Sequence, residues 1–560
     1  MAASLTLSPA RKSHVSIVLN YSEGRSLRPQ IGSVTLSVLV AIFLMATANN
    51  TFWGKATLLL QGQTVALIYL AFGLTCAFIA LCVSFSLKFL IKPFLIVLIL
   101  FSASTSWFMD SYGTIIDVNM LQSAVDTTDA EAGHLVTSAY MWHMFIFGIL
   151  PALLVGWVRI RHRTYLQKVK WNMVVIIPAL VFFFVAALSH ASTYLSLGRE
   201  HRDWFATLNP IAPIVNVVKL VIRTTSNQHI VVQPLGTDAR VYSAAPSGKP
   251  RVTIIVAGET GRAESFSLGG YGQLTNPELS KQDITYFPQT SSCGTITEVS
   301  LPCMFSVYTR KQYTHRKGLE TENLLDVLGH AGIKTEWWDN NTGDKKIADR
   351  TAYQPLYKSG NPAYCKDGEC LDSILLDQID NWLDNVKSDS VLVIHQLGSH
   401  GPAYYLRYPE EYRRFTPDCR TSEFAKCSRQ EIINAYDNTI LYTDHIISTV
   451  IDKLKARETR ISPSMIYMSD HGESTGEYGL YLHGAPYFMA PTQQTHVPFV
   501  LWLGQEAKTE VDAKCLAAEA VKPHSHDNLF HTVLGMMHVE TTVHDKALDA
   551  LAPCRQGQSS

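Results

Sequence analysis

The sequence predicts an α-helical membrane domain of five spans, followed by an α/β domain with a mostly parallel sheet covered by helices on both faces. Two observations predict this order. The first 190 or so residues hold nearly all the long apolar runs, whereas most of the charge lies beyond them. After residue 250, short apolar runs typical of strands alternate with stretches of helical spacing, and this alternation is typical of a parallel sheet.

Five apolar runs approach the roughly 20 residues that a helix needs to cross a bilayer. They cover residues 32–51, 65–87, 93–109, 136–158 and 172–190. The third is the shortest, and a buried core helix is the alternative for it. No run has the short apolar core and small-residue exit of a cleaved signal peptide, so the first run is expected to remain as an anchor. Residues 1–190 are therefore predicted to form the transmembrane domain.

The charges between the runs indicate the orientation. The loop of residues 110–135 has no Lys or Arg, and the first loop on the same side has only Lys55. By the positive-inside rule the N-terminus is then cytoplasmic, and five crossings deliver the C-terminal half outside. The basic residues on the cytoplasmic side are Arg11, Lys12, Arg25, Arg28, Lys88, Lys92, Arg159, Arg161, Arg163, Lys168 and Lys170.

Eight of the ten cysteines lie in the C-terminal half, which suits an oxidising compartment. Thiolate zinc ligands are the alternative, but no CxxC occurs. Cys76 and Cys82 lie within the second span. Pairing by proximity along the chain would join Cys293 to Cys303, Cys365 to Cys370 and Cys419 to Cys427, leaving Cys515 with Cys554.

Residues 191–250 are interpreted as a connector and residues 251–560 as the catalytic domain. Within the connector, residues 211–223 are amphipathic enough to lie on a membrane surface with Lys219 and Arg223 toward the headgroups. An ordinary packed helix is the alternative. The net charge of −1 over 560 residues gives no sign of a nucleic-acid partner.

The α/β domain is predicted to carry its ligands beyond the carboxyl ends of its strands. Glu259, His400, Asp470 and His471 all follow predicted strands closely. The strands are residues 252–257, 335–338, 391–395, 464–468 and 499–503, and the helices between them are residues 321–331, 371–387 and 432–454.

Three short motifs carry the chemistry. SSCGTITEVSLPC, at residues 291–303, places hydroxyl residues between two cysteines; SDHGES, at 469–474, and GET, at 258–260, each follow a predicted strand. A hydroxyl, two carboxylates and an imidazole at strand ends predict a metal-assisted nucleophile. From the residues alone, Thr295 and Thr297 both remain candidates for the hydroxyl.

These motifs, extended to SSCGTITEVSLPCMF and SDHGESTGEYGLYLHG and joined by GSHGPAY at 398–404, resemble the phosphoethanolamine–lipid A transferases. That family includes the mobile colistin-resistance enzymes and has the alkaline phosphatase/sulfatase fold. The resemblance covers the whole chain. It implies that Glu259, Thr297, Asp470 and His471 bind zinc and that Thr297 is the nucleophile. One zinc ion is expected, and a second is an open alternative.

The resemblance implies two further groups of site residues. One is a pair of histidines that binds phosphate or an accessory zinc ion, namely His400 and His483. The other lies near the lipid headgroup and comprises Lys345, for which a solvated loop charge is the alternative, together with Thr127, Glu131 and Ser123. Ser123 stands where relatives commonly carry Asn, so an amide hydrogen bond to substrate is in doubt there.

The implied reaction is a two-step transfer in the inner membrane, with the catalytic domain in the periplasm. Thr297 takes phosphoethanolamine from phosphatidylethanolamine, releasing diacylglycerol, and a phosphate of lipid A then takes it from the enzyme. By analogy, the added amine lowers the negative charge of the outer membrane and weakens the binding of polymyxin. The alternatives are a phosphoethanolamine or glycerol-phosphate transferase for another envelope glycan or core sugar, and a non-catalytic membrane sensor that binds headgroups.

Overall fold

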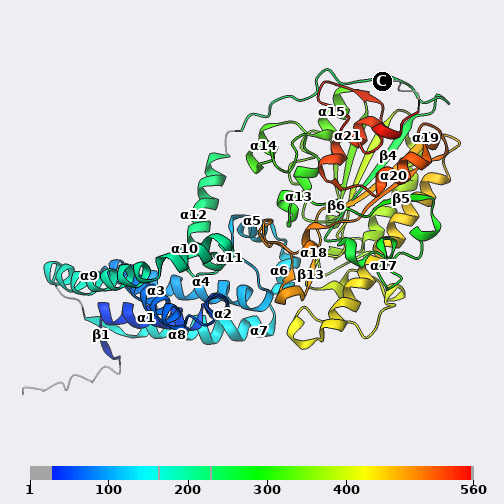
Figure 1. Cartoon of the computed structure of the whole chain (residues 1–560). Helices are drawn as coiled ribbons and strands as arrows, with labels where there is room; N and C mark the ends of the chain where they lie inside the picture. Colours follow the sequence, from blue (N-terminus) through cyan, green and yellow to red (C-terminus); the bar gives the residue numbers. More distant parts are fainter. Residues whose placement is uncertain (1–27, 162–163, 228–229, 557–560) are drawn as a thin grey trace, which may run out of the picture.

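The computed structural model describes residues 28–161, 164–227 and 230–556. A bundle of long helices lies on one side of the molecule and a larger α/β domain on the other (Figure 1). Four of the basic residues used for the orientation, Arg11, Lys12, Arg25 and Arg163, lie outside the described residues.

Within the described residues, four helices are long and apolar enough to cross a membrane, and a bent pair brings the number to five if it counts as one span. The third predicted span, expected over only 17 residues, is part of a helix of 22 residues. The helices are α3 (Thr64–Ser84), α4 (Ile91–Tyr112), the run Ser138–Trp157 formed by α7, a π-helical turn and α8 (Leu150–Trp157), and α9 (Tyr165–Ser189), with α1 (Ser33–Thr47) and α2 (Asn50–Leu59) as the bent pair.

The first predicted span is not one straight helix, because α2 turns away from α1 by 63°. The bend frees backbone carbonyls that must find other donors in an apolar surrounding. The Asn49 side chain donates to the carbonyls of Leu44 and Asn209, and the Asn209 side chain donates to those of Ala48 and Ser102. Two buried asparagines 160 positions apart therefore hold the bend, a pairing that hydropathy does not reveal.

The connector is largely helical, with α10 (Ala191–Glu200), α11 (Arg202–Ala206) and α12 (Ile211–Ser226). In Figure 1, α12 runs crosswise to the long helices and leads into the α/β domain. Lys219 is exposed and Arg223 is half-buried, and the headgroup contacts expected of both stay predictions. Arg223 is half-buried and donates to Asn119 Oδ1 at 3.1 Å, because that face of α12 packs on α5 (Val118–Asp126).

The central sheet has seven strands in the order β5-β15-β12-β4-β11-β7-β8. Within this described sheet β15 runs in the opposite direction to the other six strands. Five strands match predicted ones, whereas the short, partly polar β5 and β8 were not predicted. Their bounds are β4 Arg251–Gly258, β5 Ile284–Phe287, β7 Lys334–Asp339, β8 Ala352–Pro355, β11 Ser390–His395, β12 Ser462–Ser469 and β15 Phe499–Leu503.

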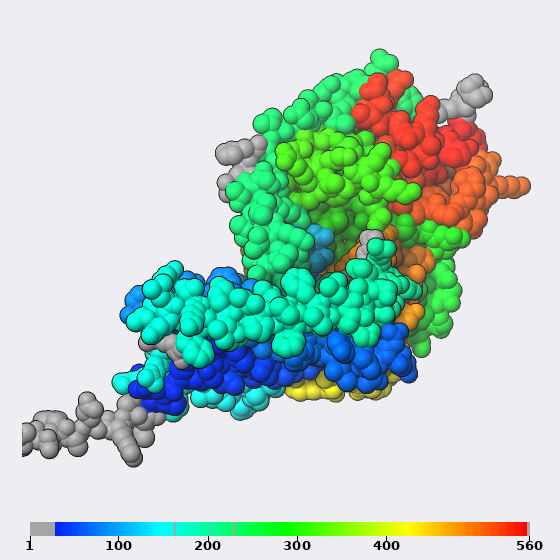
Figure 2. Space-filling view, turned by 60° about the vertical axis from the view of Figure 1, so that its left-hand side comes forward, coloured from blue at the N-terminus to red at the C-terminus, as the bar shows by residue number. Residues whose placement is uncertain are grey.

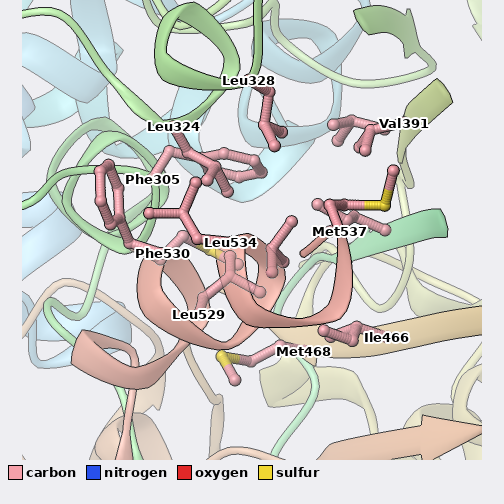
Figure 3. Packing of buried hydrophobic residues seen from close by; sticks show 14 of the residues in the cluster. Phe305, Leu324, Leu328, Val391, Ile466, Met468, Leu529, Phe530, Leu534 and Met537 are labelled. Carbon is pink, nitrogen blue, oxygen red and sulfur yellow. The ribbon is translucent and has the colours of Figure 1, made fainter. Parts of the chain in front are cut away.

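Helices cover both faces of the sheet, and each face has its own apolar core. Figure 3 shows one core, where Leu324, Phe530 and Leu534 pack toward Ile466 and Met468 of β12. The helices there are α13 (Thr297–Met304), α15 (Leu324–His330), α20 (Ala513–Ala520) and α21 (Asp527–Met536). The other face carries α17 (Arg429–Lys455) and α16 (Ile379–Asn385), which takes up only part of the helix predicted at 371–387 because residues 372–376 form a 3-10 turn.

Between α4 and the helix that begins at Ser138, a segment of two short helices, α5 and α6 (Asp129–Leu135), lies against the α/β domain. Asp117 and Thr128 cap these helices by accepting from backbone N–H groups three residues on. This segment is the acidic loop of residues 110–135, and it forms one wall of the site described next.

Candidate active site

The site lies at the carboxyl ends of two adjacent parallel strands. β4 ends at Gly258 opposite Ser469, where β12 ends, so the residues that follow must come together. Glu259 follows β4, and Asp470 and His471 follow β12; all three are buried. One ligand atom from each lies within 4.8 Å of the others, which is close enough for a single metal ion.

The donor set of this cluster fits a metal. Asp470 Oδ1 accepts from the backbone N–H groups of Thr260 and His471, whereas Oδ2 is buried with no hydrogen-bond partner among the described residues. The Nδ1 of His471 lies 2.9 Å from the Gly472 carbonyl, which leaves Nε2 to face the carboxylates. Two carboxylates and an imidazole are ordinary ligands for zinc. Asp470 Oδ2 lies 3.3 Å from His471 Nε2, and a buried carboxylate oxygen that accepts no hydrogen bond is what a cation would satisfy.

Thr297 is the first residue of α13, and its hydroxyl faces the cluster. Oγ1 lies 3.1 Å from Glu259 Oε2 and 3.4 Å from His471 Nε2. Thr295 Oγ1 instead donates to the carbonyl of Ala485 at 2.7 Å. Of the two threonines that the motif offered, Thr297 is the one whose oxygen contacts Glu259 and His471.

The charges in the cluster depend on one another. Burial would raise the pKa of Glu259, but His471, His400 and His483 together lower it to about 2. Burial and the nearby Glu259 carboxylate raise the pKa of Asp470 to about 6. Burial would lower the pKa of His471, but Asp470 and Glu259 raise it. The two carboxylates thus favour a positive charge between them, which a metal cation supplies.

The two histidines assigned to phosphate lie beside this cluster. The rings of His471 and His483 are 4.4 Å apart, and those of His400 and His483 are 5.5 Å apart. His483 Nδ1 contacts the buried Glu473 at 2.9 Å, and His400 Nε2 lies 3.4 Å from Glu131 of α6. Burial would lower the pKa of His400, but Glu131 and Glu259 raise it.

Lys345 is not a solvated loop charge, because its Nζ lies 3.0 Å from Glu298 Oε1 and both side chains are 9% exposed. The other carboxylate oxygen of Glu298 accepts from Ser123 Oγ. Thr127 Oγ1 in turn donates to the Ser123 carbonyl at 2.7 Å. Glu298 was not predicted as a site residue. The signal for it was its place directly after the candidate nucleophile.

Sequence reasoning also missed a group of polar residues at the ends of β7 and β11. Asn341 Nδ2 donates to Glu259 Oε2 at 2.8 Å, opposite the hydroxyl of Thr297. His395 Nδ1 lies 3.1 Å from Asp339 Oδ2, and both side chains are fully buried. The signal was present, since Asp339 directly follows one predicted strand and His395 is the last residue of the other. These residues orient Glu259 and close the inner side of the site.

An apolar cavity of about 270 Å³ leads from the membrane side to the two histidines. Its walls come from α4, α5 and α6 and include Phe108, Tyr112 and Met120, while His400 and His483 line its inner end. Thr127 and Ser123 also line it. The cavity has the composition expected for an acyl chain that ends in a polar headgroup.

Four disulfides are present among the described residues, and they join the same cysteines that proximity suggested. The first closes the loop that carries Thr297, and the second lies beside the site in the chain that follows β8. They are Cys293–Cys303, Cys365–Cys370, Cys419–Cys427 and Cys515–Cys554.

Comparisons with known proteins agree with this arrangement. Residues 251–539 match the sulfatase family model, and residues 74–225 match that of phosphoethanolamine transferase EptA/EptB. The chain is 37% identical to phosphoethanolamine transferase EptA of Salmonella typhimurium over 94% of this chain and 98% of that protein. It is 36% identical to the phosphatidylethanolamine transferase Mcr-1 of Escherichia coli over 86% of this chain and 91% of that protein.

A solved structure extends the likeness to three dimensions. The integral membrane lipooligosaccharide phosphoethanolamine transferase A from Neisseria meningitidis has a TM-score of 0.91 and 34% identity to this chain. The match covers 94% of this chain and all of that one. Membrane helices and sulfatase-like domain therefore share one architecture in the two proteins.

Proposed function

Since the chain belongs to the phosphoethanolamine transferase family, we propose that it moves phosphoethanolamine from phosphatidylethanolamine to a phosphate of lipid A through a covalent phosphoethanolamine-threonine. One observation carries the proposal: Thr297 Oγ1 lies 3.1 Å from Glu259 Oε2 and 3.4 Å from His471 Nε2, and that nitrogen lies 3.3 Å from Asp470 Oδ2. The names of the relatives support the donor and the class of acceptor, since one is a phosphatidylethanolamine transferase and another a lipooligosaccharide phosphoethanolamine transferase.

Glu259, Thr297, Asp470 and His471 would hold a zinc ion. When bound, such an ion lowers the pKa of a hydroxyl group and screens the negative oxygens of a phosphoryl group. Residues of the protein orient the groups that would bind the ion. Asn341 orients Glu259 through a 2.8 Å hydrogen bond, and the Gly472 carbonyl orients His471. Thr297 is the first residue of α13, so the positive end of that helix dipole lies next to it.

In the first step, the oxygen of Thr297 forms a bond to the phosphorus of the donor, and the bond from phosphorus to the glycerol oxygen breaks. The threonine proton passes to water, and the glycerol oxygen gains a proton as diacylglycerol leaves. His400 lines the apolar cavity where the acyl chains would lie, so it is placed to protonate that oxygen. His483 lines the same cavity and would contact the phosphate beside His400.

In the second step, a phosphate oxygen of the acceptor attacks the same phosphorus and the bond to Thr297 breaks. The threonine hydroxyl recovers its proton from the acceptor phosphate. Splitting the transfer in this way lets two membrane lipids use one site in turn. The product carries an added ammonium, which would reduce the negative charge of the outer membrane and its affinity for polymyxin.

We place the reaction at the periplasmic face of the inner membrane, with the N-terminus in the cytoplasm. Lys88, Lys92, Arg159 and Arg161 lie together at the end of the bundle away from the α/β domain, around one cavity. This gathering of cations supports a cytoplasmic location for that end. The disulfides of the α/β domain support an oxidising compartment for the other.

The test is to incubate the full-length protein with phosphatidylethanolamine alone and to measure the mass of the peptide that contains Thr297. One added phosphoethanolamine and an equal amount of diacylglycerol are expected. Thr297→Ala should give neither, whereas Thr297→Ser should keep part of the activity, because it retains the oxygen and loses only the methyl group that restrains the rotamer.

Thr295→Ala is the matched control, since its hydroxyl bonds to Ala485 and should not be needed for the adduct. Removal of metal by a chelator should abolish the adduct, and added zinc should restore it. An adduct on Thr295, or a fully active Thr297→Ala protein, would mean that the hydroxyl has been chosen wrongly. Undiminished adduct in metal-free protein would refute the role of zinc.

A further inference from the structure

A second cavity, of about 570 Å³, lies on the other side of α5 from the apolar cavity. The two faces of α5 line different spaces: Gln122 and Asp126 face the second cavity, whereas Met120 and Ser123 face the first. The second cavity is bounded by α12, by α14 (His315–Glu320) and by the loop of residues 342–346, and Glu298 lines it beside Thr297. Figure 2 shows a hollow between α12 and the light-green residues of the α/β domain.

Arg223 of α12 is the unusual group in this cavity. One of its N–H groups donates to Asn119 Oδ1 at 3.1 Å. Its Nε and Nη2 are shielded from solvent and have no hydrogen-bond partner within residues 28–161, 164–227 and 230–556. A guanidinium with unused donors in a fixed fork is suited to bind two oxygens of a phosphate.

The carboxylates that line the same cavity already have partners. Asp126 accepts from Gln122 at 3.0 and 3.1 Å, and Asp344 accepts from the backbone N–H of Ala348 at 2.6 Å. Glu298 is paired with Lys345. The cavity therefore holds a guanidinium with two unused donors, and each of its carboxylates is held in place by a hydrogen bond or an ion pair within the chain.

The cavity also adjoins a surface that suits a membrane lipid. Val218, Val221 and Ile222 of α12 are 52 to 63% exposed and apolar, and α12 runs crosswise to the spans in Figure 1. A helix of this kind lies along the boundary of a bilayer. A lipid in the leaflet beside α12 could place its headgroup in the cavity while its acyl chains remain in the membrane.

We propose that this cavity is the acceptor subsite, in which Arg223 binds a phosphomonoester of a lipid headgroup and presents it to the group carried by Thr297. The assignment rests on the two-step transfer proposed above. It gives the two lipids separate entrances: the donor enters along the apolar cavity and the acceptor along α12, with α5 between them. The oxygen of the bound phosphomonoester forms the new bond to phosphorus, and Thr297 leaves with the acceptor's proton.

The test separates the two half-reactions of the full-length protein in detergent micelles. Adduct formation is measured with phosphatidylethanolamine alone, and transfer is measured from preloaded protein to increasing concentrations of lipid A. Arg223→Gln should leave adduct formation within about twofold of wild type, and should raise the lipid A concentration for half-maximal transfer by about tenfold or more. Arg223→Lys keeps the charge but loses the forked pair of donors. Its lipid A concentration for half-maximal transfer should lie between those of wild type and Arg223→Gln.

Lys219→Gln is the matched control, because Lys219 is exposed on the same helix and does not line the cavity. It should match wild type in both half-reactions. If Arg223→Gln slows adduct formation as much as transfer, or leaves the lipid A dependence unchanged, the acceptor subsite is refuted. If wild type itself forms no adduct on Thr297, the proposed function fails instead, so the two failures can be told apart.

Discussion

Glu298 lies directly after the proposed nucleophile and is almost fully buried. It holds two partners at once, Lys345 at 3.0 Å and the hydroxyl of Ser123, so it connects the α/β domain to α5. Burial would raise the pKa of its carboxyl group, but Lys345 and the Ser123 hydroxyl lower it. Ser123 lines the apolar cavity and its hydroxyl donates to Glu298, so it holds that carboxylate in place from α5.

Glu298→Gln should lower the thermal stability of the full-length protein, because it leaves the Lys345 ammonium buried without its counter-charge. Breaking a buried ion pair from one side costs about 3–5 kcal/mol. Lys345→Met should be destabilising for the same reason, and the double variant should lose less than the sum of the two single losses. Thermal unfolding of all four proteins in one detergent gives the coupling energy. Additive losses would show that the two side chains do not stabilise each other.

The long helix α17 supports the sheet face behind the site. It begins with a capping box, in which the Ser428 hydroxyl accepts from the Glu431 N–H and the Glu431 carboxylate accepts from the Ser428 N–H. In its middle the buried Asp444 accepts from the backbone N–H groups of Glu278 and Leu279 at 2.8 and 3.1 Å. Burial raises the pKa of Asp444 to about 7, so ionising this group opposes folding.

The sign of the resulting pH dependence follows from proton binding. Between about pH 4 and pH 7 the folded state holds a proton on Asp444 that the unfolded state has lost, so this group's contribution to stability falls as pH rises. It levels off above pH 7. Asp444→Asn does not titrate and should lack this dependence, although it loses one acceptor. The melting temperature of wild type relative to Asp444→Asn should therefore fall from pH 5 to pH 8; parallel curves would contradict the assignment.

The membrane part and the α/β domain are joined through the acidic segment between the spans. Glu369 of the α/β domain contacts His134 of α6 at 2.9 Å and Arg407 at 2.6 and 3.0 Å. Burial would raise the pKa of Glu369, but His134 and Arg407 hold it well below its usual range. Since Arg407 Nε also donates to the His400 carbonyl, this contact ties the docking of α6 to the position of a proposed catalytic histidine.

Glu369→Gln should loosen α6 from the α/β domain while leaving the sheet intact, because the amide keeps the shape but removes the charge. Hydrogen exchange of residues 129–135 should become faster in the full-length protein, and exchange in β4 and β12 should not change. The rate of adduct formation should also fall in Glu369→Gln, because α6 would no longer be held against the α/β domain. Glu423→Gln is the control, since Glu423 contacts Lys426 at 2.8 Å and Ser138, which lies beyond α6, at 3.0 Å, so exchange of α6 should stay unchanged. Unchanged exchange at α6 in Glu369→Gln would show that this contact does not hold α6 on the α/β domain.

Much of this architecture was predictable from local patterns. Apolar runs predicted the membrane helices, because a bilayer requires continuous apolar length, and β-rich runs predicted five of the seven strands, because strands buried on both faces must be apolar throughout. The strands β5 and β8 were missed since they are short, lie at the sheet edges and carry polar residues. The bend after α1 was missed because the Asn49–Asn209 contact joins distant parts of the chain.

The motifs alone indicated a hydroxyl, two carboxylates and an imidazole at strand ends, because those residue types follow apolar runs directly. Which hydroxyl faces the carboxylates was decided only in three dimensions, since Thr295 and Thr297 differ in direction rather than in chemistry. The same holds for the contacts of Glu298 with Lys345, of Glu369 with His134 and of Arg223 with Asn119. Local sequence sets the length and apolar character of each element, but side-chain partners far apart in the chain are chosen by how the elements pack.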